Sequence, residues 1–256
     1  MPRFVDVPRI VQPQEFADVN ASSPLASGLL SYWIGSGVGD WVETNAPVAE
    51  VSIAGLARRF AAASSQYISR PSRVRGLPLT IGAIARRASA SSTQGIAGIG
   101  AATDSRIELY FTTSAAAIQS RNASGTGAIS ASTVTSTSAF YTLVGVCHST
   151  TSRSIYVNGT GKVTDTGASA PDPCGTEIIG AFYSSGTPSL YLDGSIALVC
   201  IWNRALSDDE VAEWSANPWG VFTDECVYRY VAPVSSGFKP SWTVNANSVL
   251  QGSLAA

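Results

Sequence analysis

The fold is decided by one stretch in the last third of the chain, residues 193–211, which reads DGSIALVCIWNRALSDDEV. Its first part, Ile196 to Trp202, is a short apolar run that follows a glycine-containing turn, which indicates a buried strand. Its second part contains a capping box, because the Ser207 hydroxyl can accept from the third helical N–H while Glu210 reaches back. The stretch therefore predicts a core strand that leads into a capped helix.

The helix that begins after Ser207 is predicted to be short. Two aspartates follow Ser207 and suit the positive end of the helix dipole. Leu206 and Val211 stand at the positions of a hydrophobic staple. Asn217-Pro218 ends the helix, because the residue before a proline is pushed out of the α region. These signals predict a single helix of about ten residues beside the core.

Short β-candidates fill most of the remaining chain. Asn158-Gly159, between two of them, is a strong signal for a tight hairpin turn. More than ten short strands with frequent turns indicate a sandwich or barrel and not βαβ units, and no repeat of fixed period is present. The expected strands are 29–34, 41–44, 48–53, 59–60, 66–68, 79–85, 96–100, 106–112, 116–119, 140–148, 152–157, 177–182, 189–192 and 195–202.

Three segments between residues 155 and 211 carry a family resemblance. The hairpin sequence 155–159, the strand start 193–197 and the segment 202–211 resemble the corresponding parts of laminin-G-like, concanavalin A-like lectin/glucanase jelly rolls. Asn217-Pro218-Trp219 is similar to the ending common in phage and bacterial members of that family. The resemblance implies a two-sheet antiparallel jelly-roll topology, which the strand pattern alone could not select.

Upstream, the resemblance is less sharp. Residues 29–33 and 79–83 occupy the places of two family strands, but Ala83 and Ile84 stand where a tryptophan is usual. The resemblance covers roughly residues 27–232. We therefore expect an all-β jelly-roll sandwich over residues 28–232, with one short helix.

Both ends of the chain lack a sustained hydrophobic period. Prolines interrupt residues 1–27 and 233–256, which predicts extended N- and C-terminal arms. Such arms either bind a neighbouring protein or copy, or pack back on their own domain. Their apolar anchors, which we expect to bind partners, are Phe4, Val5, Ile10, Val11, Phe238, Trp242, Val249 and Leu250.

Composition argues against several classes of function. Hydrophobic residues make up 45% of the chain, which is enough for a core. The net charge of -2 offers no basic excess for neutralising phosphates, so no nucleic-acid partner is expected. The apolar runs are too short to span a bilayer. The N-terminus has no apolar leader, so if the protein works outside a cell, we expect release by lysis or within a particle and not by secretion.

The cysteines and the histidine give no sign of a metal site. The cysteines, at 147, 174, 200 and 226, and the single His148 fit no zinc motif. Cys147 and Cys200 lie in apolar runs and are expected to be buried free thiols, with a disulfide as the alternative. No cofactor is expected. Three isolated acids near turns are Asp40, Asp104 and Asp193. We interpret them as ordinary turn residues, with calcium binding as the alternative.

Catalytic groups are not recognisable. Jelly-roll glycosidases place paired carboxylates on alternate residues of one strand, and no such Glu-x-Asp-x-Glu pattern occurs. The acids at 208–210 are explained by helix capping, and those at 224–225 by a solvated loop. His148 alone cannot supply a triad, and no nucleophile elbow is present. We expect no enzymatic activity.

Aromatic residues near loops are the candidates for sugar binding, because exposed rings can stack on sugars. Trp41, Tyr110 and Tyr183 are these candidates, with Trp41 and Tyr183 near Gly/Ser-rich loops. Trp33 lies in the first apolar strand and is expected in the core.

Two functional hypotheses follow. The first is a non-catalytic phage virion protein, assembled in the bacterial host cytoplasm, such as a capsid decoration or head-fibre protein. It would bind other virion proteins and further copies of itself through its arms and sandwich surface. The alternative is a carbohydrate-binding receptor module of a tail fibre or adhesin, which would bind a surface glycan.

Overall fold

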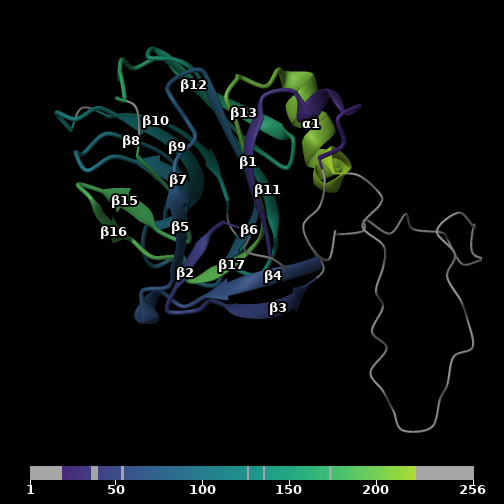
Figure 1. The fold of residues 1–256 in the computed structure, drawn as a ribbon, viewed down its shortest axis with the longest axis vertical. Coiled ribbons are helices and arrows are strands. Elements are labelled where there is room, and N and C mark those ends of the chain that lie inside the picture. The colour runs from purple at the N-terminus through teal and green to yellow at the C-terminus, as the bar shows by residue number, and fades with distance from the viewer. Residues whose placement is uncertain are drawn as a thin grey trace, which may run out of the picture.

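Two large antiparallel sheets packed face to face form a jelly-roll β-sandwich (Figure 1). The structure is a computed structural model that describes residues 19–35, 40–52, 55–125, 127–134, 136–172 and 175–222. The eight-stranded sheet has the order β13 (Thr160–Asp165), β12 (Ser152–Val157), β11 (Tyr141–Ser149), β6 (Leu79–Arg87), β17 (Gly194–Trp202), β4 (Gly55–Phe60), β3 (Val48–Ser52), with β1 (Leu29–Ile34) also pairing with β17.

The seven-stranded sheet carries the remaining long strands. Its order is β10 (Gly127–Thr133), β9 (Ala115–Arg121), β8 (Arg106–Phe111), β7 (Gln94–Gly100), β14 (Thr176–Ile179), β5 (Tyr67–Pro71), β2 (Val42–Thr44). A separate hairpin consists of β15 (Phe182–Ser184) and β16 (Thr187–Ser189). The helical elements are α1 (Asp208–Ala216) and three short 3-10 turns, η1 (Pro24–Ala26), η2 (Ala62–Ser64) and η3 (Pro218–Val221).

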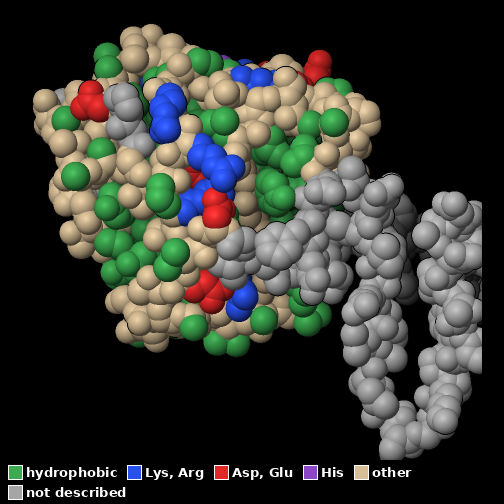
Figure 2. All heavy atoms as spheres, viewed as in Figure 1, with side chains coloured by type: hydrophobic (Ala, Val, Ile, Leu, Met, Phe, Trp, Pro, Cys, Tyr) green, Lys and Arg blue, Asp and Glu red, His purple; other side chains and the backbone are tan. Residues whose placement is uncertain are grey.

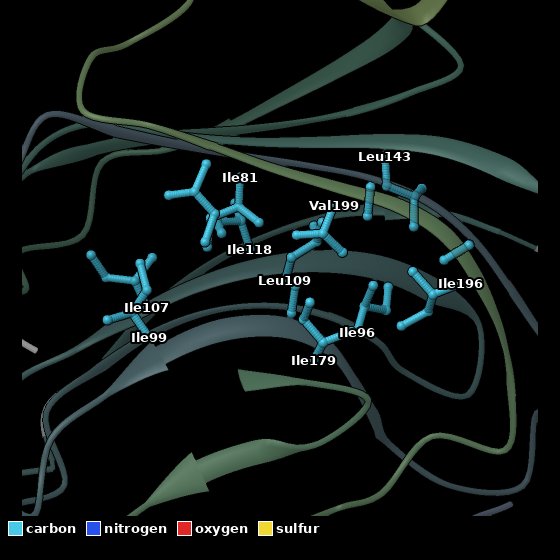
Figure 3. Close-up of a cluster of buried hydrophobic side chains, with 14 of the residues drawn as sticks. Ile81, Ile96, Ile99, Ile107, Leu109, Ile118, Leu143, Ile179, Ile196 and Val199 are labelled. Carbon is cyan, nitrogen blue, oxygen red and sulfur yellow. The ribbon is translucent and has the colours of Figure 1, made fainter. Parts of the chain in front are cut away.

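The main core lies between the two sheets (Figure 3). Alternate residues of each strand point into it, as the period of two requires. Ile107 and Leu109 enter from β8, and Ile81 and Val199 enter from the opposite sheet. On β8 the intervening residues therefore face outward, away from this core.

A second core covers the outer face of the eight-stranded sheet. The rings of Trp202 and Trp214 meet edge to face there, with centroids 5.8 Å apart. The Trp202 indole N–H donates to the Leu25 carbonyl at 2.7 Å. This bond joins the residues before β1 to the sheet face on which the Trp214 ring of α1 packs.

The capped helix is confirmed. The Glu210 N–H donates to the Ser207 hydroxyl at 3.2 Å, and the Ser207 N–H donates to the Glu210 carboxylate at 2.9 Å. The predicted turn is also confirmed, since Asn158 and Gly159 both have positive φ, at 53° and 73°.

The strand predictions are confirmed in most of the chain and wrong in a few places. The first strand occupies residues 29–34 as expected, but β10 and β13 were not predicted. The expected strand at 177–182 is two strands of different sheets, β14 and β15. The expected strand at 189–192 is wrong, because β16 ends at Ser189.

The predicted arms lie largely outside the described residues. Their anchors Phe4, Val5, Ile10, Val11, Phe238, Trp242, Val249 and Leu250 all fall there. Residues 19–27, part of the predicted N-terminal arm, pack on the sandwich: Val19 bridges to Phe222, and Leu25 is buried.

Both cysteines expected in the core are there. Cys147 and Cys200 are buried free thiols, whereas Cys174 and Cys226 lie outside the described residues. Within the described ranges, no helix combines the length and apolar character needed to cross a membrane.

Candidate functional site

The candidate site lies on the outer face of the seven-stranded sheet. The β15–β16 hairpin lies beside β7 there (Figure 1). Glycines in β7 allow this approach: a Cβ on Gly95 would fall 2.5 Å from the Phe182 nitrogen, and one on Gly100 would fall 2.3 Å from the Tyr183 carbonyl oxygen. Any larger side chain at these positions would displace the hairpin from the sheet.

Glu108 is buried beneath this hairpin. One of its carboxylate oxygens accepts from the Tyr183 N–H at 2.9 Å, and the other lies 2.9 Å from the Arg106 Nε. Burial raises the pKa of Glu108 to about 8, although Arg106 opposes the shift. The hairpin is therefore attached to the sheet through a carboxyl group that is excluded from water.

A charge ladder, defined here as Arg121, Asp104, Arg106 and Glu108, leads from this buried group toward solvent. Arg106 and Arg121 are paired in register on β8 and β9, and Asp104 forms ion pairs with both. The exposed fraction of the side chain falls from 32% at Arg121 to 1% at Glu108. At the outer end Arg121 lies beside Asp104, so this end offers charged hydrogen-bonding groups of both signs.

Two of the three predicted sugar-binding aromatics reach this face. Tyr110 is buried against Phe182, with ring centroids 5.0 Å apart in an edge-to-face arrangement. Burial raises the pKa of Tyr110 to about 12. Tyr183 is only half-buried, and its ring lies beside Gly100. Tyr183 is therefore the predicted aromatic residue that a ligand could contact on this face.

The expectation that Trp41 is exposed is wrong. Trp41 is 6% exposed and belongs to the core between the sheets. The Arg70 guanidinium stacks over its ring at 4.4 Å, and its indole N–H donates to the Tyr32 carbonyl at 3.1 Å. The glycines and serines near Trp41 in the sequence suggested an exposed loop. In the structure, the Arg70 side chain covers the ring and contributes to its burial. Trp33 is buried as expected.

Two buried glutamates lie on opposite faces of the seven-stranded sheet. Glu108 is in register with Gly98 on the outer face. Glu177 is in register with Ile99, a residue of the core between the sheets, and is held by the Arg70 Nε at 2.8 Å. Sequence reasoning missed both glutamates. The alternation of polar and apolar residues in 106–111 was the signal that could have located Glu108.

The three acids considered for calcium are each paired with arginine. Asp40 lies 2.6 Å from Arg70, and Asp193 lies 2.6 Å from Arg59. Asp104 belongs to the charge ladder. In the ranges that the structure describes, no three His, Cys, Asp or Glu side chains gather as metal ligands would. Arginine thus neutralises each of these acids.

Charges on the surface follow the same pattern in part. In Figure 2, some charged side chains on the visible face lie in small groups that contain both signs, and others lie singly. This face carries no extensive patch of one sign, in keeping with the net charge of -2.

Fold and site together define a lectin-like jelly-roll domain with a partly covered sheet face. A family model described as the concanavalin A-like lectin/glucanases superfamily matches residues 62–212. Because this match spans more than half of the chain, the protein belongs to that superfamily. Among curated proteins, no sequence matches this chain.

The chain was also compared with solved structures. A Trypanosoma rangeli sialidase in complex with 2,3-difluorosialic acid matches with a TM-score of 0.55 and 18% identity, over 81% of this chain and 37% of that chain. The CBM40 domain of a Ruminococcus gnavus IT-sialidase, bound to α2,3 sialyllactose, matches with a TM-score of 0.47 and 18% identity, over 55% of this chain and 84% of that chain. At 18% identity, the likeness to the Trypanosoma rangeli sialidase shows the fold alone.

Proposed function

We propose that this protein is a non-catalytic carbohydrate-binding module. Its binding surface is the outer face of the seven-stranded sheet beside the β15–β16 hairpin. The observation that carries the proposal is the position of Tyr183, whose half-buried ring lies next to Gly100 while its backbone is bound to Glu108 at the inner end of the charge ladder. Binding sites for small ligands combine an apolar surface with a few fixed polar groups.

The outer end of the ladder supplies those polar groups. Arg121 is held by Asp104 at 2.8 Å and keeps part of its side chain in solvent. Its planar guanidinium has five N–H donors, and Asp104 contributes acceptors. Hydroxyl groups of a sugar can bond to such groups while a ring face contacts Tyr183. Membership of a superfamily of lectins and glucanases supports this assignment.

The absence of catalysis is part of the proposal and is supported by the two buried glutamates. Glycosidases need two carboxyl groups that flank one glycosidic bond. Glu108 and Glu177 lie on opposite sides of the same sheet, and each is paired with an arginine. They cannot act together on one substrate.

A glycan array probed with the full chain tests the proposal. Tyr183→Ala and Arg121→Ala should weaken binding of any retained glycan by about tenfold or more, equivalent to ~1.4 kcal/mol. Matched controls lie on the eight-stranded sheet. Phe140→Ala removes a half-buried ring beside Arg86, and Arg59→Ala removes an arginine paired with an aspartate. Both controls should bind like the wild type.

Two results would reject the assignment. The first is that the full chain binds no glycan on a broad array. The second is that the control variants lose binding as strongly as Tyr183→Ala and Arg121→Ala do, because the ligand would then occupy the other sheet.

A second candidate is a phage virion structural protein, such as a capsid decoration or head-fibre protein. It is suggested by Asn217-Pro218-Trp219, a sequence similar to the ending common in phage and bacterial members of the family. Deleting residues 1–18 or, separately, 236–256 should then reduce incorporation into particles. Residues 19–27 must be kept, since they pack on the sandwich. Normal incorporation of both truncated chains would reject a role of the arms.

A further inference from the structure

Gln119 is an amide side chain of the candidate site that lies beside the charge ladder. On β9 the preceding Ile118 points into the core between the sheets, so Gln119 points to the outer face of the seven-stranded sheet. Gln119 is in register with Glu108 of β8 on one side and with Ile129 of β10 on the other. It therefore continues the row that begins at Glu108, on the side away from the β15–β16 hairpin.

The amide of Gln119 is nearly buried and has no partner in the part of the chain that the structure describes. The residue is 9% exposed, and its side chain forms no hydrogen bond with any described residue. A primary amide carries two N–H donors and a carbonyl acceptor. Polar groups that are largely removed from water are normally hydrogen-bonded, because leaving such a bond unmade costs free energy. Gln119 thus has a hydrogen-bonding capacity that a ligand can use.

Gly127 of β10 provides the space for this amide. It lies opposite Arg121 and is exposed. A Cβ on Gly127 would fall 2.9 Å from the Gln119 Nε2 and 3.6 Å from the Arg121 Cγ. The amide nitrogen therefore lies over an exposed glycine, next to the arginine at the outer end of the ladder.

Ile129 adds an apolar surface beside the amide. It is 48% exposed, and residues directly opposite each other on antiparallel strands have Cβ atoms about 5 Å apart. A single exposed apolar residue is common on protein surfaces, but this one flanks an amide without a partner. A ligand group that matches both residues must combine a hydrogen-bond donor and an acceptor with a small apolar part.

We propose that Gln119 and Ile129 bind the acetamido group of an N-acetylated sugar. The inference rests on the proposed function, because it places this group in the carbohydrate site beside Tyr183 and Arg121. The acetamido N–H can donate to the Gln119 carbonyl, and the acetamido carbonyl can accept from the Gln119 amide, while the methyl group contacts Ile129. A hydroxyl group in the same place would satisfy only one of the two amide atoms with good geometry and would offer Ile129 no apolar contact.

A glycan array that carries matched pairs tests the inference with the full chain. The members of a pair differ only in an acetamido against a hydroxyl group, as N,N′-diacetylchitobiose and cellobiose do. The acetamido member of a retained pair should bind about tenfold tighter or more in calorimetric titration, because a site built to hydrogen-bond a group rejects the analogue that lacks it. Gln119→Leu, which keeps the size of the side chain and removes the amide, should bring the ratio of the two affinities close to one.

Gly127→Ala is a second variant that leaves the amide in place chemically. Its methyl group would displace the Gln119 Nε2 and should also lower the ratio. Val42→Ser is the matched control, since Val42 is 62% exposed on β2, at the other edge of the same sheet. This control should keep the ratio of the wild type. Circular dichroism of each variant establishes that a change in binding does not come from unfolding.

The inference and the proposed function fail in different ways. An array on which no glycan is retained rejects the proposed function and the inference with it. Retained glycans without preference for the acetamido member of a pair reject the inference alone. So do a preference that survives in Gln119→Leu and a preference that Val42→Ser loses to the same extent.

Discussion

The backbone N–H of Tyr183 donates to a carboxylate oxygen of Glu108 across 2.9 Å, so a hairpin of the surface is bonded to a buried acid of the sheet. Residues 75 positions apart in the sequence are joined by this bond. The protonation state of Glu108 links the free energy of unfolding of the domain to pH.

Glu108→Gln tests that link. The pKa of Glu108 is raised by burial to about 8, from an ordinary value of 4.5. Between these values the folded chain keeps a proton that the unfolded chain has lost. The free energy of unfolding should therefore contain a component that falls as the pH rises from about 5 to about 8. Denaturation with urea at three pH values should show that Glu108→Gln lacks this component. Parallel pH profiles for the two proteins would contradict the burial argument.

Ser207→Ala tests the helix cap. Removing the hydroxyl that accepts from the Glu210 N–H should lower the free energy of unfolding by ~1 kcal/mol. Ser114→Ala, at an exposed turn between β8 and β9, serves as the control and should stay within ~0.5 kcal/mol of the wild type. Equal effects of the two substitutions would show that the cap contributes nothing.

Glu210→Gln probes the same cap through pH. The hydrogen bond with Arg204 and that with the Ser207 N–H lower the pKa of Glu210 to about 2, from 4.5. As the pH falls from about 4.5 to about 2, the unfolded chain takes up the proton first, so the stabilisation is progressively lost. Acid titration of unfolding should be less steep for Glu210→Gln than for the wild type in this range. An unchanged slope would be inconsistent with the lowered pKa.

Trp41→Ala distinguishes a core residue from a binding residue. Because the Trp41 ring packs between the sheets under Arg70, its removal should cost about 3–5 kcal/mol of folding free energy. Trp41→Phe, which keeps an aromatic ring there, should cost less. Thermal and chemical denaturation measure both effects. A stable Trp41→Ala protein that only loses glycan binding would restore Trp41 as a site residue.

The sequence predicted the elements whose signals are local. The Ser207–Glu210 capping box, the Asn158-Gly159 turn and the apolar run of β17 each depend on neighbouring residues, and the structure confirms all three. The jelly-roll topology came from the family resemblance, because strand order depends on pairings between residues distant in the chain.

The candidate site was only partly predictable. Burial of Tyr110 depends on Phe182 from a hairpin that crosses the sheet, and burial of Trp41 depends on Arg70 from another strand. The strand β10, rich in serine and alanine, gave no clear period of two because both residue types are tolerated on either face. Its position is fixed by seven paired residues along β9.

Mapping a bound glycan by backbone amide chemical shifts of the full chain tests the central claim most directly. With a glycan selected from the array, the largest shift changes should fall on Tyr183, Gly100 and Arg121, and they should disappear in Tyr183→Ala. Changes confined to the eight-stranded sheet, or their persistence in Tyr183→Ala, would contradict a carbohydrate site at the hairpin-covered face.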